Sequence, residues 1–269
     1  MDNRQFTFFT ALKLLLFTAA AVGVKYACSV YLTAPLDRLM PSVIMALVTL
    51  GMIYFIEHNK PSFICEGNMG ESLVVGFTSA VLVYVVPVYI LWATDSIKYY
   101  SATDDGDIVS CLSYAVDEGL FPGIVIFGYI FHMLWCYVND RTAVVMCSIM
   151  YFAYVIIYRY NVIQSLLNNE LVSSNSITLV NIAILAVSVS VMVLAFGDVL
   201  SAAPYLFWLC FFEYTAARFL HIGMFGQAMQ TGIEMYSLPT VMLMLILRIL
   251  TFIIYILAKK RSTNTSSNS

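Results

Sequence analysis

The sequence predicts an all-α integral membrane protein, a polytopic helix bundle of about eight transmembrane helices with both termini in the cytoplasm. Of its 269 residues, 61% are hydrophobic and 11% are charged, whereas a soluble globular domain carries about 25% charged residues. The apolar residues also fall in long blocks, which a chain surrounded by water would not tolerate. Composition and block length together predict the fold class.

A hydrocarbon core of about 30 Å requires roughly 20 apolar residues per helix. The first block follows Met1–Gln5 without a small-residue cleavage site, so we expect a spanning helix rather than a cleaved signal. Seven or nine spans remain compatible with the pattern. The eight predicted spans lie near residues 8–32, 40–56, 72–94, 109–138, 142–158, 175–197, 203–228 and 239–258.

The distribution of lysine and arginine between alternate connecting segments sets the orientation. With the N-terminus inside, the inner segments hold seven basic residues and the outer segments hold three, which favours cytoplasmic termini. The inner residues are Arg4, Lys13, Lys60, Arg141, Lys259, Lys260 and Arg261, and the outer residues are Arg38, Lys98 and Arg159. We expect residues 1–261 to form one transmembrane domain, and the polar composition of residues 262–269 predicts a disordered tail.

Several function classes are excluded by composition. The net charge is −3 and no block of basic residues suits a phosphate backbone, so we expect no nucleic-acid partner. The six cysteines are scattered without CxxC or CxxH spacing, and the sequence therefore predicts no metal site and no cofactor. The bilayer itself is the expected environment of nearly the whole chain.

Ionisable residues inside the predicted spans are the candidates for function, because each costs about 2.5–3.5 kcal/mol at bilayer depth. Three are acids and three are bases, so interhelical ion pairs would use them all without any catalysis. A functional site remains the other interpretation. The acids are Asp117, Glu118 and Glu213, and the bases are Lys25, Arg218 and Arg248.

Helical spacing groups some of these residues. Tyr214, Arg218 and His221 stand at i, i+4 and i+7 and share one face of the seventh predicted helix. Glu118 and His132 also align along the fourth, but about 21 Å separates them at 1.5 Å per residue. They cannot form a catalytic pair with each other.

The fourth predicted span carries a motif. It reads Ala-Val-Asp-Glu-Gly-Leu-Phe-Pro-Gly over residues 115–123. This resembles the first motif of the CPBP family of CAAX-protease and bacteriocin-processing membrane proteins, whose bacterial members often read Glu-Glu-x-x-Phe-Arg-Gly. Asp117, Glu118, Phe121 and Gly123 match in position, and Pro122 replaces the arginine.

Two later segments are similar in layout to the same family. Phe152 matches the Phe-x-x-x-His motif, with Ile156 in place of the histidine. Residues 197–208 resemble Gly-Ser-Leu-Trp-x-Pro-x-x-x-His, with Trp208 at the histidine position and Phe212 at the following asparagine position. The resemblance covers about residues 70–225, and the family's count of eight spans also fits.

In active members of the family, the resemblance implies, a glutamate activates water and histidines assist peptide-bond cleavage within the membrane. Ile156 has no ring nitrogen, and the indole N–H of Trp208 donates hydrogen bonds but does not exchange its proton as a histidine does. The resemblance therefore predicts a catalytically degenerate relative, a binding, immunity or accessory subunit that holds a transmembrane helix or peptide of another membrane protein. The family places it in a plasma membrane, with the bacterial inner membrane expected.

Two alternatives remain open. The first is an active intramembrane endopeptidase with a rearranged site, in which Glu118 and Asp117 act with His132 or His221. The second is a small transporter that uses an intramembrane cluster. Helices broken near Pro87, Pro122 and Pro204 would support it, because discontinuous spans line many substrate sites. The transporter cluster would comprise Glu213, Tyr214, Arg218, His221 and Arg248.

Overall fold

The structure is a computed structural model that describes residues 8–56, 69–93, 108–158, 172–196, 202–219 and 238–266. This part of the chain is helical and contains no strand. Its elements are α1 (Phe8–Tyr31), α2 (Leu36–Gly51), η1 (Met52–Ile56), α4 (Met69–Ala80), η2 (Val81–Val85), α5 (Val86–Ala93), α6 (Ile108–Ala115), η3 (Val116–Leu120), η4 (Gly123–Ile130), α7 (Phe131–Tyr137), α8 (Asp140–Tyr158), α10 (Val172–Phe196), α11 (Ala202–Phe219) and α13 (Leu238–Ser266).

Each predicted span corresponds to a helix or to a run of consecutive helices, because a long apolar block must satisfy its backbone hydrogen bonds internally. Residues 220–228 of the seventh predicted span lie outside the described residues. One boundary differs. Helix α13 continues to Ser266 and so includes five residues of the segment 262–269 for which composition predicts disorder. Backbone i to i−4 bonding extends past Arg261 although serine, threonine and asparagine favour a helix only weakly.

Four helices in the described part of the chain are long and apolar enough to cross a membrane by length and composition, as expected for a membrane protein. Shorter apolar helices cover Gly70–Val85, Ile182–Ala195 and Leu245–Leu257. The four long helices are Phe8–Tyr31, Leu36–Phe55, Ile108–Tyr137 and Asp140–Ile157.

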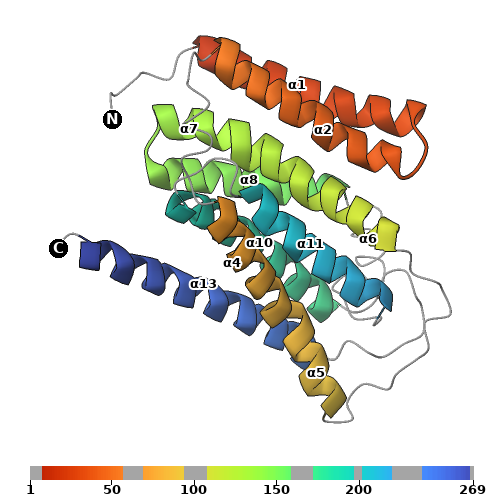
Figure 1. Cartoon of the computed structure of the whole chain (residues 1–269), viewed down its shortest axis with the longest axis vertical. Coiled ribbons are helices and arrows are strands. Elements are labelled where there is room, and N and C mark those ends of the chain that lie inside the picture. Colours follow the sequence, from red (N-terminus) through yellow and green to blue (C-terminus); the bar gives the residue numbers. More distant parts are fainter. Residues whose placement is uncertain are drawn as a thin grey trace.

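The helix Ile108–Tyr137 (the central rod, comprising α6, η3, η4 and α7) lies at the middle of the bundle. In its most apolar stretch, 83% of the residues are buried. The corresponding share is 17% for α1 and 28% for each of the helices Leu36–Phe55 and Asp140–Ile157. Figure 1 shows α1 and α2 paired along one edge, with α13 at the opposite edge. Residues predicted on the fourth span are therefore enclosed by the other helices.

The central rod changes from α-helical to π-helical hydrogen bonding at η3 and η4. Pro122 follows η3 and has no N–H to donate to the previous turn. The N–H of Phe121 instead bonds to the carbonyl of Val116, five residues back. The hydroxyl of Ser42 on α2 donates to the same carbonyl at 3.1 Å. Asp117 and Glu118 thus lie in a widened turn immediately before the proline, and such π-helical turns are frequent at functional sites.

Three glycines bring the backbone of α11 against its neighbours. A Cβ on Gly123 would lie 2.6 Å from Cα of Ala203, and one on Gly119 would lie 2.8 Å from Cα of Phe207. On the other side of α11, a Cβ on Gly76 of α4 would lie 2.7 Å from Cα of Tyr205. Small residues permit this close approach of helices. Helix α11 is consequently packed between α4 and the central rod.

The connection between the central rod and α8 is short and ordered by side chains. Asn139 accepts a 2.8 Å hydrogen bond from the N–H of Thr142, which is an N-cap arrangement. The indole N–H of Trp135 donates to Asp140 at 2.9 Å. These contacts fix α8 beside the rod.

Candidate functional site

Asp117, in the turn before Pro122, forms an ion pair with a lysine from the first helix. Nζ of Lys25 on α1 is 3.0 Å from Oδ1 of Asp117 on η3, and it donates a 2.7 Å hydrogen bond to the hydroxyl of Tyr154 on α8. The same ammonium is 4.7 Å from the ring centroid of Phe121. These four residues, hereafter the Lys25 cluster, come from three separate helices.

Burial determines what the Lys25 cluster can do. The side chain of Asp117 is 5% exposed and that of Lys25 is 17% exposed. A charge buried to this degree persists when an opposite charge and further hydrogen bonds accompany it. The Lys25 ammonium is the opposite charge that accompanies the Asp117 carboxylate. The Tyr154 hydroxyl accepts a hydrogen bond from this ammonium, and the Phe121 ring lies close to it. The arrangement is suited to holding α1, the central rod and α8 together.

Glu118 is buried at 2% exposure in the same π-helical turn. His132 is also 2% exposed, on α7 of the same rod. Fourteen residues separate them along one continuous helical rod, which is at least three helical turns. Direct hydrogen bonding between these two side chains is therefore excluded. His221 lies outside the described residues.

The four positions at which the sequence departs from the motifs that it resembles carry side chains without an acidic or basic group. Trp208 and Phe212 on α11 both lie against the ring of Phe77 on α4, with centroids 5.1 and 5.5 Å apart. Ile156 is half-buried on α8, and Pro122 is buried in the central rod. None of these four side chains can transfer a proton.

A second polar cluster joins α13, η2 and α11. Nη2 of Arg248 donates a 2.6 Å hydrogen bond to the hydroxyl of Tyr84, and that hydroxyl donates to Oε2 of Glu213 at 3.4 Å. Arg248 is 3% exposed, Tyr84 is 1% exposed and Glu213 is 6% exposed. These three residues, hereafter the Arg248 cluster, form an Arg–Tyr–Glu bridge across the interior.

Further tyrosines surround Arg248. Tyr205 shares a side-chain hydrogen bond with Ser79. Tyr205 and Tyr151 both interact electrostatically with Arg248, as Glu213 does. The guanidinium therefore faces one carboxylate and several hydroxyl dipoles in a low-dielectric interior, where such interactions are strong.

The structure brings together only part of the polar cluster predicted on the seventh and eighth spans. Glu213 and Arg248 do meet, through Tyr84. Tyr214 instead stacks on Tyr114 of α6, with ring centroids 4.3 Å apart. Arg218 belongs to α11 but its side chain lies outside the described part of the chain, as His221 does. Among the described residues, no three His, Cys, Asp or Glu side chains are grouped as metal ligands would be.

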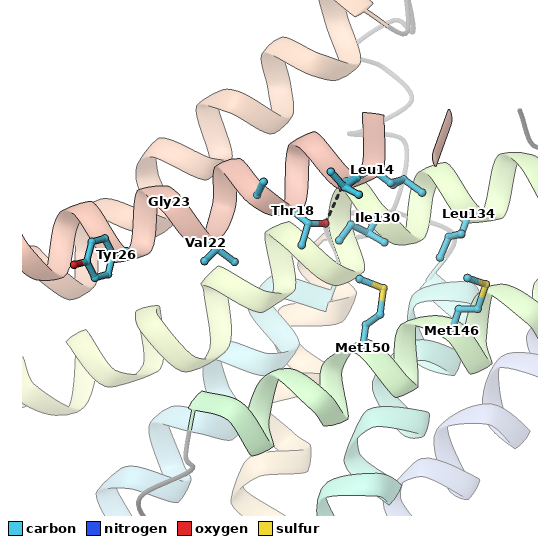
Figure 2. A pocket seen from close by; sticks show the side chains of 11 residues that line it. Leu14, Thr18, Val22, Gly23, Tyr26, Ile130, Leu134, Met146 and Met150 are labelled. Carbon is cyan, nitrogen blue, oxygen red and sulfur yellow. Dashed lines mark hydrogen bonds between the residues drawn. The ribbon is translucent and has the colours of Figure 1, made fainter. Parts of the chain in front are cut away.

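An apolar groove lies between α1, the central rod and α8 (Figure 2). Its volume is about 740 Å³. The hydroxyl of Thr18 in its wall bonds to the carbonyl of Leu14 at 2.8 Å, within α1. The lining residues are Leu14, Leu15, Thr18, Ala19, Val22, Gly23, Tyr26, Ile130, Leu134, Met146 and Met150.

The Lys25 cluster lies next to one end of this groove. Figure 2 shows Tyr26 at that end and Leu134 and Met146 at the other. Lys25 precedes Tyr26 on α1, and Tyr154 lies one helical turn beyond Met150 on α8. The Lys25–Tyr154 hydrogen bond thus joins two walls of the groove at the end marked by Tyr26.

Comparison with known proteins adds no identification, since no family model, curated protein or solved structure matches this chain. The resemblance to the CPBP family rests on the motifs quoted above.

Proposed function

We propose that this chain is a multi-pass membrane protein that binds a transmembrane helix of another membrane protein in the groove beside α1. We further propose that it is a catalytically degenerate relative of CPBP-family intramembrane proteases and acts as an immunity or accessory subunit. The observation that carries the proposal is the apolar groove of about 740 Å³. The acid beside it, Asp117, is already paired with Lys25, so the groove is suited to binding and not to acid–base chemistry.

The proposed topology has eight spans, with both termini in the cytoplasm of a bacterial inner membrane. The helices and helical runs described above number eight. Helix α1 begins and α13 ends on the same side of the molecule in Figure 1, as an even count requires. The excess of lysine and arginine that the sequence predicts for the inner segments favours the cytoplasm for both termini.

The proposed absence of catalysis is supported by the chemistry at each motif position. A general base must reach the proton it abstracts, within about 2.6–3.2 Å or through one water. Asp117 is 3.0 Å from Lys25. Trp208 and Phe212, at positions where the family carries polar side chains, pack on Phe77. Glu118 would have to act without the histidines that assist it in the family.

The proposed occupant is a helix because of the shape and chemistry of the groove wall. The stretch of α1 from Leu14 to Tyr26 is about 18 Å long at 1.5 Å per residue, more than half of a bilayer core. Ala19 and Gly23 lie on this wall, and a Cβ on Gly23 would meet nothing within 4 Å. Small residues let a second helix approach closely. Met146 on the opposite wall can adapt to its side chains.

Site-specific photo-cross-linking in native membranes tests this function. A photoreactive amino acid at Val22 in the groove should yield a discrete adduct with a membrane polypeptide. The matched control is Leu47 on α2, which is 65% exposed and does not line the groove. Filling the groove by Ala19→Leu with Gly23→Leu should abolish the Val22 adduct. Adducts to lipid alone at Val22, or the same polypeptide adduct at Leu47, would refute helix binding in the groove.

A further inference from the structure

The Lys25 cluster connects the two walls of the groove to its floor. Helix α1 forms one wall, α8 the other, and the central rod lies between them. Lys25 extends from α1, Tyr154 from α8 and Asp117 from the rod, with Nζ of Lys25 at 2.7 Å and 3.0 Å from its two partners. One side chain therefore links all three lining elements at one end of the groove.

Helix α1 is otherwise lightly embedded. Four of its 24 residues are buried, namely Thr10, Phe17, Ala21 and Cys28. It packs mainly against α2, with which it forms the pair at the edge of the bundle in Figure 1. An apolar contact towards the rod is made by Phe17, whose ring centroid lies 4.2 Å from that of Tyr129. Along the remaining wall, the groove separates α1 from α8.

We propose that α1 is the movable wall of the groove and that the Lys25 cluster is its latch. When Lys25 is bound to Asp117 and Tyr154, α1 is held against the rod and α8 and the groove is narrow. When the latch is released, α1 tilts away from the rod and α8 while α2, held on the rod by the Ser42–Val116 hydrogen bond and the buried Met45, stays in place, and the groove opens sideways into the bilayer. This gate rests on the proposed function, because it is the route by which a membrane-embedded helix would enter.

The chemistry of the latch suits a two-state device. In a low-dielectric interior an ion pair is strong when its geometry is satisfied, and breaking it by removing one partner is strongly unfavourable. Because the contacts of Lys25 are short-ranged and directional, they fix the position of α1 in the closed state. Phe121 places its ring 4.7 Å from the ammonium and stabilises Lys25 in the closed position.

The experiment measures distances by pulsed electron paramagnetic resonance in purified full-length protein in lipid nanodiscs, without any partner. Spin labels on genetically encoded amino acids at Leu16 of α1 and Ile149 of α8 report the gate, because both side chains are exposed. A second pair, at Ile149 and Ile246 of α13, reports the integrity of the rest of the bundle. Lys25→Met should lengthen and broaden the Leu16–Ile149 distance by roughly 5 Å or more, the scale of a helix displacement by one turn, and leave the Ile149–Ile246 distance unchanged.

If Lys25→Met fails to fold, two further variants test the latch, and a third serves as the control. Asp117→Asn preserves size and should open the gate in part, and Lys25→Asp combined with Asp117→Lys should restore the wild-type distance. Tyr255→Phe on α13 removes a 2.9 Å hydrogen bond to Glu71 far from the groove and should change neither distance. An unchanged Leu16–Ile149 distance in a folded Lys25→Met or Asp117→Asn protein would overturn the latch. Since no partner is present, that result would leave the cross-linking test of helix binding unaffected.

Discussion

Arg248 reaches from the last described helix into the interior and donates a 2.6 Å hydrogen bond to the hydroxyl of Tyr84. The Tyr84 hydroxyl in turn donates to Glu213 at 3.4 Å, so α13 is connected through one tyrosine to α11. Arg248 also lies over the Tyr84 ring, with Cζ 5.8 Å from the centroid. A helix at the edge of the bundle is thereby attached by a polar side chain that is 3% exposed.

The first prediction concerns the stability of this attachment. Arg248→Met should lower the free energy of unfolding by about 3–5 kcal/mol, because removing the guanidinium leaves the buried Glu213 carboxylate without the positive charge that faces it through Tyr84. Tyr84→Phe removes a hydroxyl but no charge and should cost about 1–3 kcal/mol. Reversible unfolding in bicelles, followed by steric trapping, measures both values.

The control is the exposed Arg141 at the start of α8. Arg141→Met should change stability by less than about 0.5 kcal/mol. Adding Glu213→Gln to Arg248→Met should recover part of the loss, because the double variant buries no charge in this cluster. Equal losses for Arg248→Met and Arg141→Met would show that the Arg248 cluster does not stabilise the bundle.

The second prediction concerns the close approach of α11 to the central rod. Gly123→Ala should destabilise the protein by about 1–3 kcal/mol, because the new Cβ would lie 2.6 Å from Cα of Ala203 and backbone atoms must shift. Gly51→Ala is the matched control, since its Cβ would meet nothing within 4 Å. There alanine should stabilise by about 0.5–1 kcal/mol through its helix propensity. Thermal unfolding in the same detergent compares the two, and opposite signs are expected.

The helices could be predicted from the sequence because a bilayer imposes one rule on every span, an apolar block of about 20 residues. The pairing of Lys25 with Asp117 could not be predicted from the sequence. The two residues lie 92 positions apart, and their contact depends on the rotation of α1 about its axis, which an apolar sequence does not specify. The even match of acids and bases indicated ion pairs in general but no particular partners.

Two features of the structure, the role of Tyr84 and the groove, could not be predicted from the sequence. Tyr84 is one of 18 tyrosines, and nothing in its neighbours distinguishes a tyrosine that bridges Arg248 and Glu213 from one at the membrane interface. The groove is lined mostly by apolar residues, and lipid-facing surfaces have the same composition as packed ones. The π-helical turn had a partial signal in Pro122, because proline must interrupt the hydrogen bonding of the turn before it.

The third prediction tests a hydrogen bond between α8 and α10. The hydroxyl oxygens of Ser148 and Ser190 lie 2.9 Å apart. Each hydroxyl has one proton, which it can donate either to the other serine or to a backbone carbonyl, that of Val144 or Ala186 for Ser148 and that of Ala186 for Ser190. A double-mutant cycle with Ser148→Ala and Ser190→Ala should give a coupling of about 0.6 kcal/mol and no more than about 1.7 kcal/mol. Ser29→Ala, an exposed serine bonded within its own helix, should be nearly neutral. A coupling of zero would mean that the carbonyl bonds compensate fully.

The fourth prediction distinguishes structural charge from transport. Glu213→Gln in proteoliposomes should leave proton and cation flux at the level of empty vesicles, as should the wild type. Glu213 is 6% exposed and hydrogen-bonded to Tyr84 in the described interior, so its expected role is to face Arg248. The same variant should lower thermal stability. Flux in the wild type that Glu213→Gln abolishes would support the transporter instead.

The last prediction concerns Glu118, the remaining acid of the motif. Purified protein in liposomes should cleave a library of quenched transmembrane peptides no faster than its Glu118→Gln variant does. Peptide hydrolysis needs a positioned base and a group that protonates the leaving amine. His132 lies at least three helical turns from Glu118 along the central rod, and Asp117 is engaged by Lys25. Glu213→Gln serves as the control for a buried acid outside the motif. Cleavage that Glu118→Gln abolishes and Glu213→Gln preserves would establish an active endopeptidase, and His221 would then be the first histidine to test.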